Sequence, residues 1–154
     1  MSVALAVVLH ALSAVVWVGG MFFAWLLLRP ASGALEAGAR LALWQRVLGR
    51  FLAWVAVAVL LLFATGFYMV AALGGMGRVS AWVHVMLALG VAMTLLFGWA
   101  WWEPFRRLRA ASGAADRKTA GNQLRQIARL VGVNLTLGLV TVAIGALASL
   151  HPVG

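Results

Sequence analysis

The chain of 154 residues is 65% hydrophobic and only 10% charged, and its formal net charge is +9. A soluble domain has about 25% charged residues, so the composition excludes a water-soluble globular fold and predicts an all-α integral membrane protein. The absence of cysteine excludes disulfides, thiolate metal sites, iron–sulfur clusters and covalently attached haem.

Four apolar runs, taken in chain order, predict four membrane-spanning helices. A helix needs about 20 residues to cross the hydrocarbon, and its backbone polar groups must be paired internally. The first run is too long for the core of a signal peptide and no Lys or Arg precedes it, so we expect it to be retained. The runs cover about 3–28, 51–73, 81–102 and 130–150, and they predict one domain, 1–154, built as a four-helix bundle.

The distribution of the cations predicts the orientation of the bundle. The loop between the second and third runs holds only Arg78, while the other eleven cations lie between runs one and two or between runs three and four. Cytoplasmic loops carry the excess of Lys and Arg. We therefore expect both termini on the periplasmic or extracellular side of a bacterial-type inner membrane. No polar domain is left to carry these cations to nucleic acid, so a nucleic-acid partner is not expected.

Two segments between the runs, 35–49 and 116–130, are compatible either with short amphipathic helices on the membrane surface or with solvated basic loops. In the fourth run, small residues recur at near-helical spacing and predict close packing of another helix. These residues are Gly138, Thr141, Gly145 and Ala148.

All three histidines are predicted on one side of the membrane, namely His10 in the first run, His84 in the third and His151 after the fourth. Intramembrane ionisable residues are costly and are candidates for function. His10 and His84 differ in predicted depth by roughly 6 Å, which helix tilt can absorb. These two histidines are suited to be the axial ligands of a haem b bound between the helices. They also suit copper, with Met69, Met76 or His151 as further ligands, or plain hydrogen bonds to neighbouring helices.

Four other residues near these histidines are candidates for contact with a cofactor. Trp17 is suited to stack on a porphyrin or to fill the core, and Gly20 to admit a macrocycle or another helix. Tyr68 and Arg78 are suited to bind a haem propionate or to anchor the chain at the interface. No carboxylate pair, Ser/His/Asp arrangement, phosphate loop or HExxH motif is present, so the sequence has no hydrolase or transferase signature. A membrane oxidoreductase is the one enzyme class that stays open.

Three segments together resemble the copper resistance protein D (CopD) membrane family: LHALSAVVWVGGMFF at 9–23, WVHVM at 82–86 and RLVGVN at 129–134. The resemblance implies a four-helix inner-membrane bundle associated with copper uptake or tolerance. The pattern is also similar to HemJ-type protoporphyrinogen oxidases and to four-helix b-type cytochromes, which bind haem b. Their histidine positions match His10 and His84, and Met86 stands at the lysine position of the oxidases.

The leading hypothesis from the sequence is a haem b protein in which His10 and His84 are the axial ligands. It would pass electrons between a membrane pool such as quinone and a periplasmic redox or copper partner. The alternative is copper binding or import through the same histidines, and the second alternative is a structural or assembly subunit without a cofactor. Oligomer formation is left open.

Overall fold

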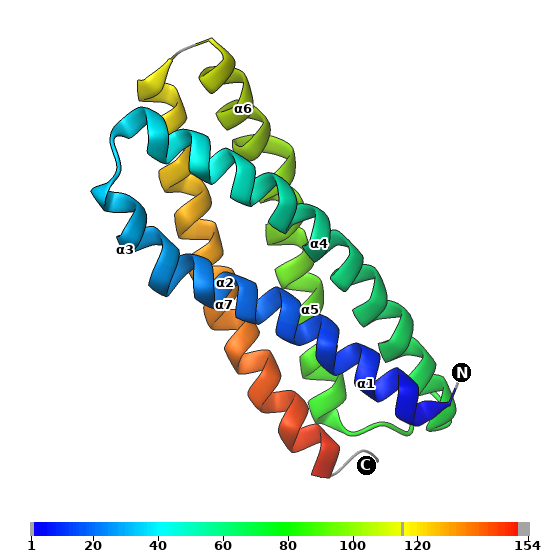
Figure 1. Ribbon diagram of the computed structural model, residues 1–154. Helices are drawn as coiled ribbons and strands as arrows, with labels where there is room; N and C mark the ends of the chain where they lie inside the picture. Colours follow the sequence, from blue (N-terminus) through cyan, green and yellow to red (C-terminus); the bar gives the residue numbers. More distant parts are fainter. Residues whose placement is uncertain (1, 115, 151–154) are drawn as a thin grey trace.

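The computed structural model describes residues 2–114 and 116–150 and is all-α. Four long helices, Val3–Ala34, Ala37–Ala72, Ala81–Gly113 and Arg117–Leu150, are each long and apolar enough to cross a membrane. The four-helix membrane bundle predicted from the sequence is therefore confirmed. The chain runs up and down through the bundle, and the beginning of the first helix and the end of the last lie at the same end (Figure 1).

The first helix is a series of short segments: α1 (Val3–Ala14), α2 (Gly20–Phe22) and α3 (Arg29–Ala31). Wider π-helical turns, Val15–Gly19 and Phe23–Leu28, join them, and a 3₁₀ turn, Ser32–Ala34, follows. The Ser2 hydroxyl caps the start of α1 by accepting a hydrogen bond from the backbone N–H of Leu5 at 3.2 Å.

The second helix, α4 (Ala37–Ala72), is regular over its 36 residues. The third consists of α5 (Ala81–Ala100), a π-helical segment (Trp101–Phe105) and α6 (Arg106–Gly113). This π-helical segment contains Pro104. Proline has no N–H to donate, so it interrupts the α-helical hydrogen-bond ladder. The fourth helix, α7 (Arg117–Leu150), has 34 residues.

The segments 35–49 and 116–130 are neither surface helices nor loops, so both readings of them were wrong. Nearly all of each segment forms the first turns of a spanning helix, α4 or α7. No proline interrupts either helix, and at 1.5 Å per residue α4 is about 54 Å long, well beyond a hydrocarbon layer of about 30 Å. We call the end formed by these extensions and α6 the basic end. The opposite end, with loop 73–80, is the histidine end.

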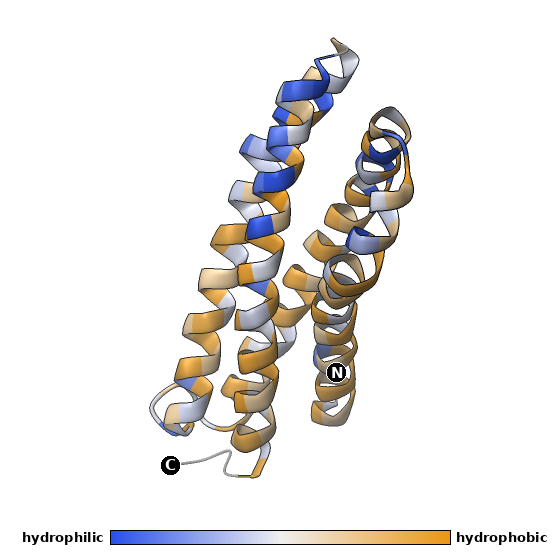
Figure 2. Ribbon diagram, turned by 90° about the vertical axis from the view of Figure 1, so that its left-hand side faces the viewer, coloured by the Kyte–Doolittle hydropathy of each residue, from blue (hydrophilic) through white to orange (hydrophobic). Residues whose placement is uncertain are grey.

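The helices form two pairs. α1 packs on α4, while α5 and α6 pack on α7, and contacts of α7 with α2 and α4 join the pairs (Figure 1). Polar residues gather at the basic end, and apolar residues cover the remainder of the bundle (Figure 2). The loop between α4 and α5 turns through Gly74 and Gly75, whose φ angles of +97° and +95° favour glycine.

Two hydrophobic clusters form the core. The first lies at the basic end, where Trp44 and Leu48 of α4 meet Leu108 of α6 and Ile127 of α7. The second lies at mid-bundle and includes Trp17, Met21, Val55, Met93 and Leu135. Among the described residues, the buried members of these clusters do not include the residues that contact His10 or His84. The histidine end is therefore held mainly by contacts within each pair.

Candidate functional site

His10 is held against α4 by a hydrogen bond. Its Nδ1 lies 3.0 Å from Oγ1 of Thr65, a residue that is 2% exposed. The Thr65 hydroxyl has one proton, which it donates to the Leu61 carbonyl at 2.5 Å. Oγ1 must therefore accept from Nδ1–H, and this assigns the tautomer of His10. Its Nε2 then keeps a lone pair.

His84 shows the same arrangement on a different element. Its Nδ1 lies 3.2 Å from the backbone carbonyl oxygen of Ser80, one turn earlier. A carbonyl oxygen only accepts, so Nδ1 carries the proton and Nε2 has the lone pair. Metal-binding histidines usually have one ring nitrogen hydrogen-bonded to an oxygen and the other free for the metal. Both intramembrane histidines are in that state.

The two histidines lie at similar depth in the bundle when both depths are measured from the layer around Gly138. Val18 and Met93 both meet the position that a Cβ would take at Gly138. His10 is eight residues before Val18 and His84 nine residues before Met93. At 1.5 Å per residue these separations are about 12 and 14 Å along the bundle.

The histidines nevertheless belong to different helix pairs. His10 faces Thr65 and Gly66 of α4. α5 packs on α7 through the side that carries Met86 and Met93. His84 precedes Met86 by two residues, about 200° around the helix, so it lies on the other side of α5 and is exposed. Within the described ranges, no three His, Asp or Glu side chains gather into a metal-binding group.

The small-residue stripe of α7 admits methionine side chains from two other helices. At Gly138, a Cβ would lie 3.1 Å from the Met93 methyl carbon and 3.5 Å from that of Met21, and both side chains are 2% exposed. The Thr141 hydroxyl lies 3.7 Å from the Met93 sulfur. One level closer to the histidine end, the Met86 sulfur lies 3.4 Å from the Cβ position of Gly145. The predicted close packing along this stripe is confirmed, and it places two thioethers together in the bundle core.

Sequence reasoning did not identify this Met21–Met93 layer as a candidate site. The stripe on α7 predicted a close approach, but the partners come from helices far apart in the chain. The stripe itself was the available signal, since methionine readily fills the space left by a glycine.

Trp17 and Gly20 serve packing in this structure. Trp17 is 4% exposed in the mid-bundle cluster and makes an edge-to-face contact with Phe97 at 6.2 Å between ring centroids. The space beside Gly20 is occupied by the Phe51 ring of α4. These contacts agree with the core-filling alternative for Trp17. For Gly20 they agree with the helix-packing alternative.

The other predicted residues that the structure describes lie at the histidine end, on α4 and in the loop that follows it. Tyr68 and Met69 are half-buried near the end of α4, and Met76 is half-buried in the following loop. Arg78 is exposed in the same loop, where its aliphatic stem lies over Gly74. His151 lies outside the described residues.

A small cavity of about 30 Å³ lies between the two core clusters, lined by Trp17, Met21, Phe97 and Asn134 among others. Asn134 is 5% exposed, and its Oδ1 is buried without a hydrogen-bond partner in the described structure. A cavity above about 15 Å³ has room for a water molecule. The middle of the bundle thus combines a polar oxygen with the thioether layer.

Comparison with known proteins gave one match. No curated protein and no solved structure matched the chain. The family model for copper resistance protein D matched residues 45–148, which include His84, Met93 and Asn134 but begin after the first helix. The resemblance of the His10 segment therefore stays a prediction, as does the similarity to haem proteins. Because the match spans most of the described bundle, the chain belongs to the copper resistance protein D (CopD) family and is a copper-related multi-pass membrane protein.

Proposed function

We propose that this protein binds copper(I) inside the membrane, with His10 and His84 as nitrogen ligands. The observation that carries the proposal is the hydrogen bonding of the two rings. Both Nδ1 atoms are engaged with oxygen, at 3.0 and 3.2 Å, which leaves each Nε2 as a metal-accepting lone pair. The family gives copper priority over haem b, which was the leading hypothesis from the sequence.

The thioether layer supplies the second part of the proposal. Imidazole and thioether ligands together favour Cu(I) among the biological metals. Met21 lies eleven residues after His10 and Met93 nine residues after His84, or about 16 and 14 Å deeper along a helix rise of about 1.5 Å per residue. Copper(I) received at the histidine level would next meet these two sulfurs. A pair of neutral thioethers binds weakly enough to release the ion again, which suits transfer better than storage.

The direction of transfer follows from the proposed orientation. Eleven of the twelve cations lie between the first and second or between the third and fourth apolar runs, and this asymmetry supports a cytoplasmic location for the basic end. The histidine end then faces the periplasm or the exterior of a bacterial-type inner membrane. Copper would reach the histidines from that side, delivered by a periplasmic partner.

Haem b is the second candidate, and the same ring geometry favours it. An axial haem ligand also presents Nε2 while Nδ1–H is hydrogen-bonded to oxygen. When bound, haem would supply one-electron redox chemistry toward quinone or a periplasmic redox partner. Binding of His10 and His84 to one metal ion, whether copper or haem iron, would require His84 to turn from its present side of α5 toward α1.

The test is an anaerobic titration with Cu(I) in competition with a chromophoric chelator, using detergent-purified protein. We expect a protein-dependent site whose affinity falls at least about tenfold in His10→Ala and in His84→Ala. Ser149→Ala is the control, because this exposed hydroxyl at the same end bonds only to the Ala146 carbonyl of its own helix. Binding no tighter than that of protein-free micelles would contradict the proposal. A Soret band that shifts on dithionite reduction, lost in the same histidine variants, would favour haem.

A further inference from the structure

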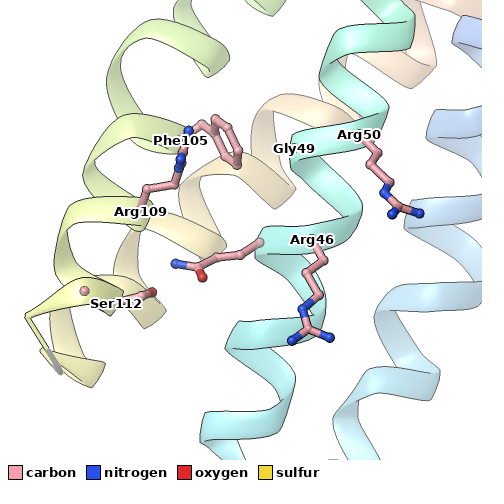
Figure 3. A pocket seen from close by; sticks show the side chains of 8 residues that line it. Arg46, Gly49, Arg50, Phe105, Arg109 and Ser112 are labelled. Carbon is pink, nitrogen blue, oxygen red and sulfur yellow. The ribbon is translucent and has the colours of Figure 1, made fainter.

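A pocket lies far from the histidines, at the basic end. It has a volume of about 510 Å³ and separates α4 from α6. Gln45, Arg46 and Arg50 line it from α4, and Arg109 and Ser112 line it from α6. Phe105, which is 5% exposed, forms an apolar part of its wall against Gly49 (Figure 3).

The charge of this pocket is not balanced within the described structure. It has three arginines and no acidic residue in its lining. The ion pair formed by the described residues joins Arg107 to Glu103 and does not involve these three guanidinium groups. Asp116 is engaged in capping α7 through the Thr119 backbone N–H at 3.0 Å. An anion is the ligand that this electrostatic field attracts.

The neutral polar groups of the pocket suit an oxyanion. The Ser112 hydroxyl is buried and has no hydrogen-bond partner in the described structure. Figure 3 shows it on the side of α6 that faces α4. Gln45 donates to the Leu108 carbonyl at 3.4 Å and so bridges the two walls. Arg109 lies along α6 beside Phe105, whereas the exposed Arg46 and Arg50 side chains leave α4 on the side away from α6 (Figure 3). Their guanidinium groups must turn toward α6 to reach a ligand in the pocket.

The level of the pocket identifies the source of the anion. Trp54 follows Arg50 by one helical turn and is 66% exposed, and Trp102 precedes Phe105 by three residues and is 70% exposed. Tryptophans of membrane proteins are enriched at the headgroup level. The Arg106 guanidinium covers the Trp102 ring at 4.9 Å, as expected where a cation meets this belt. The pocket thus opens where lipid phosphates are concentrated.

We propose that the pocket between α4 and α6 binds the phosphate of an anionic phospholipid headgroup. Arg46, Arg50 and Arg109 supply the charge, and Ser112 donates a hydrogen bond to a phosphate oxygen. The Phe105 and Gly49 wall accommodates the glycerol and the first part of an acyl chain. The lipid then joins α4 to α6 at the end of the bundle where the two helix pairs are linked through the basic-end cluster.

The experiment measures quenching of tryptophan fluorescence by lipids with brominated acyl chains. The full-length protein is reconstituted in phosphatidylcholine vesicles with increasing brominated phosphatidylglycerol, and the reverse series gives the preference for the anionic lipid. We expect Arg46→Gln/Arg50→Gln/Arg109→Gln to lower this preference by at least about fivefold. The control Arg117→Gln/Lys118→Gln/Arg125→Gln removes the same charge from the exposed start of α7, and it should keep most of the preference.

Three further measurements make the result decisive. Circular dichroism of both triple variants checks that the helices are retained, and Ser112→Ala gives a smaller loss without removing charge. An equal loss in the pocket and control variants would show general attraction to an anionic surface and would overturn the proposal. If inorganic phosphate in pure phosphatidylcholine vesicles raises the melting temperature of the wild type but not of the pocket variant, and anionic lipid adds nothing, the site takes a free phosphate ion and the lipid assignment is wrong.

Discussion

Thr65→Val tests whether the hydrogen bond to His10 prepares a metal ligand. Valine keeps the shape of threonine but removes the oxygen that accepts from Nδ1–H at 3.0 Å. Thr65 is 2% exposed, so water cannot replace the lost oxygen without repacking α1 against α4. Interhelical hydrogen bonds in membranes contribute about 0.6 kcal/mol on average and up to about 1.7 kcal/mol. The bundle should therefore remain folded.

The effect on metal binding should be larger than the effect on folding. Loss of the hydrogen-bond partner of a ligating histidine costs about 10- to 100-fold in metal affinity, or about 1.4 to 2.7 kcal/mol. The chelator competition assay measures this affinity, and unfolding in a denaturing detergent measures stability. Thr94→Val is the matched control, because its hydroxyl donates to the Gly90 carbonyl of its own helix and bonds to no other side chain. Equal Cu(I) affinity in Thr65→Val and Thr94→Val would refute the reasoning.

Three further predictions concern the bundle core and the start of α7. Met93→Leu conserves volume and should cost less than about 1.5 kcal/mol of stability, while Cu(I) titration should show weaker binding because one thioether is gone; unchanged binding would remove Met93 from the site. Gly138→Ala would place a Cβ 3.0 Å from Val18 and 3.1 Å from Met93, so detergent unfolding should show a loss of about 1 to 3 kcal/mol. The control Gly90→Ala, with nothing within 4 Å of its Cβ, should be neutral or stabilising. Hydrogen bonds from the Thr119 side chain and backbone N–H lower the pKa of Asp116, so the cap is fully formed above the ordinary Asp pKa of about 3.9 and is lost as the pH falls through the lowered value. Amide exchange in the first turn of α7, corrected for intrinsic rate, should show this loss in the wild type but not in Asp116→Asn.

The four spans could be predicted because composition alone decides them. Apolar runs longer than about 20 residues have no other stable location, and the structure confirms four such helices. The helix boundaries were less accessible. Residues 37–50 and 117–129 are polar enough to resemble loops, but they contain no proline and continue the helices of the adjoining spans.

The orientation of the site residues was the part that the sequence could not supply. α5 is apolar on all sides, so its pattern favours no face for packing, and it was not possible to predict that Met86 and Met93 would turn toward α7 while His84 turned away. The contact of Met21 with the Gly138 layer depends on the meeting of the two helix pairs, which local periodicity does not encode. Hydrogen bonds from the histidines to neighbouring helices were one of the alternatives, but the sequence did not identify Thr65 as the partner of His10.

The pocket at the basic end was not predicted from the sequence, for a different reason. Its arginines were counted as loop residues, which predicts their side of the membrane but not which residues they contact. Once α4 continues through them, Arg46 and Arg50 lie four residues apart and line the same pocket as Arg109. The helical extensions therefore bring arginines that are far apart in the sequence to the lining of one pocket.

The most direct test of the central claim is X-ray absorption at the copper edge of the Cu(I)-loaded protein. The account predicts imidazole scattering from the bound copper in the wild type, and loss of part of this scattering in both His10→Ala and His84→Ala. A copper environment without imidazole, or one that neither substitution changes, would contradict the assignment of these histidines.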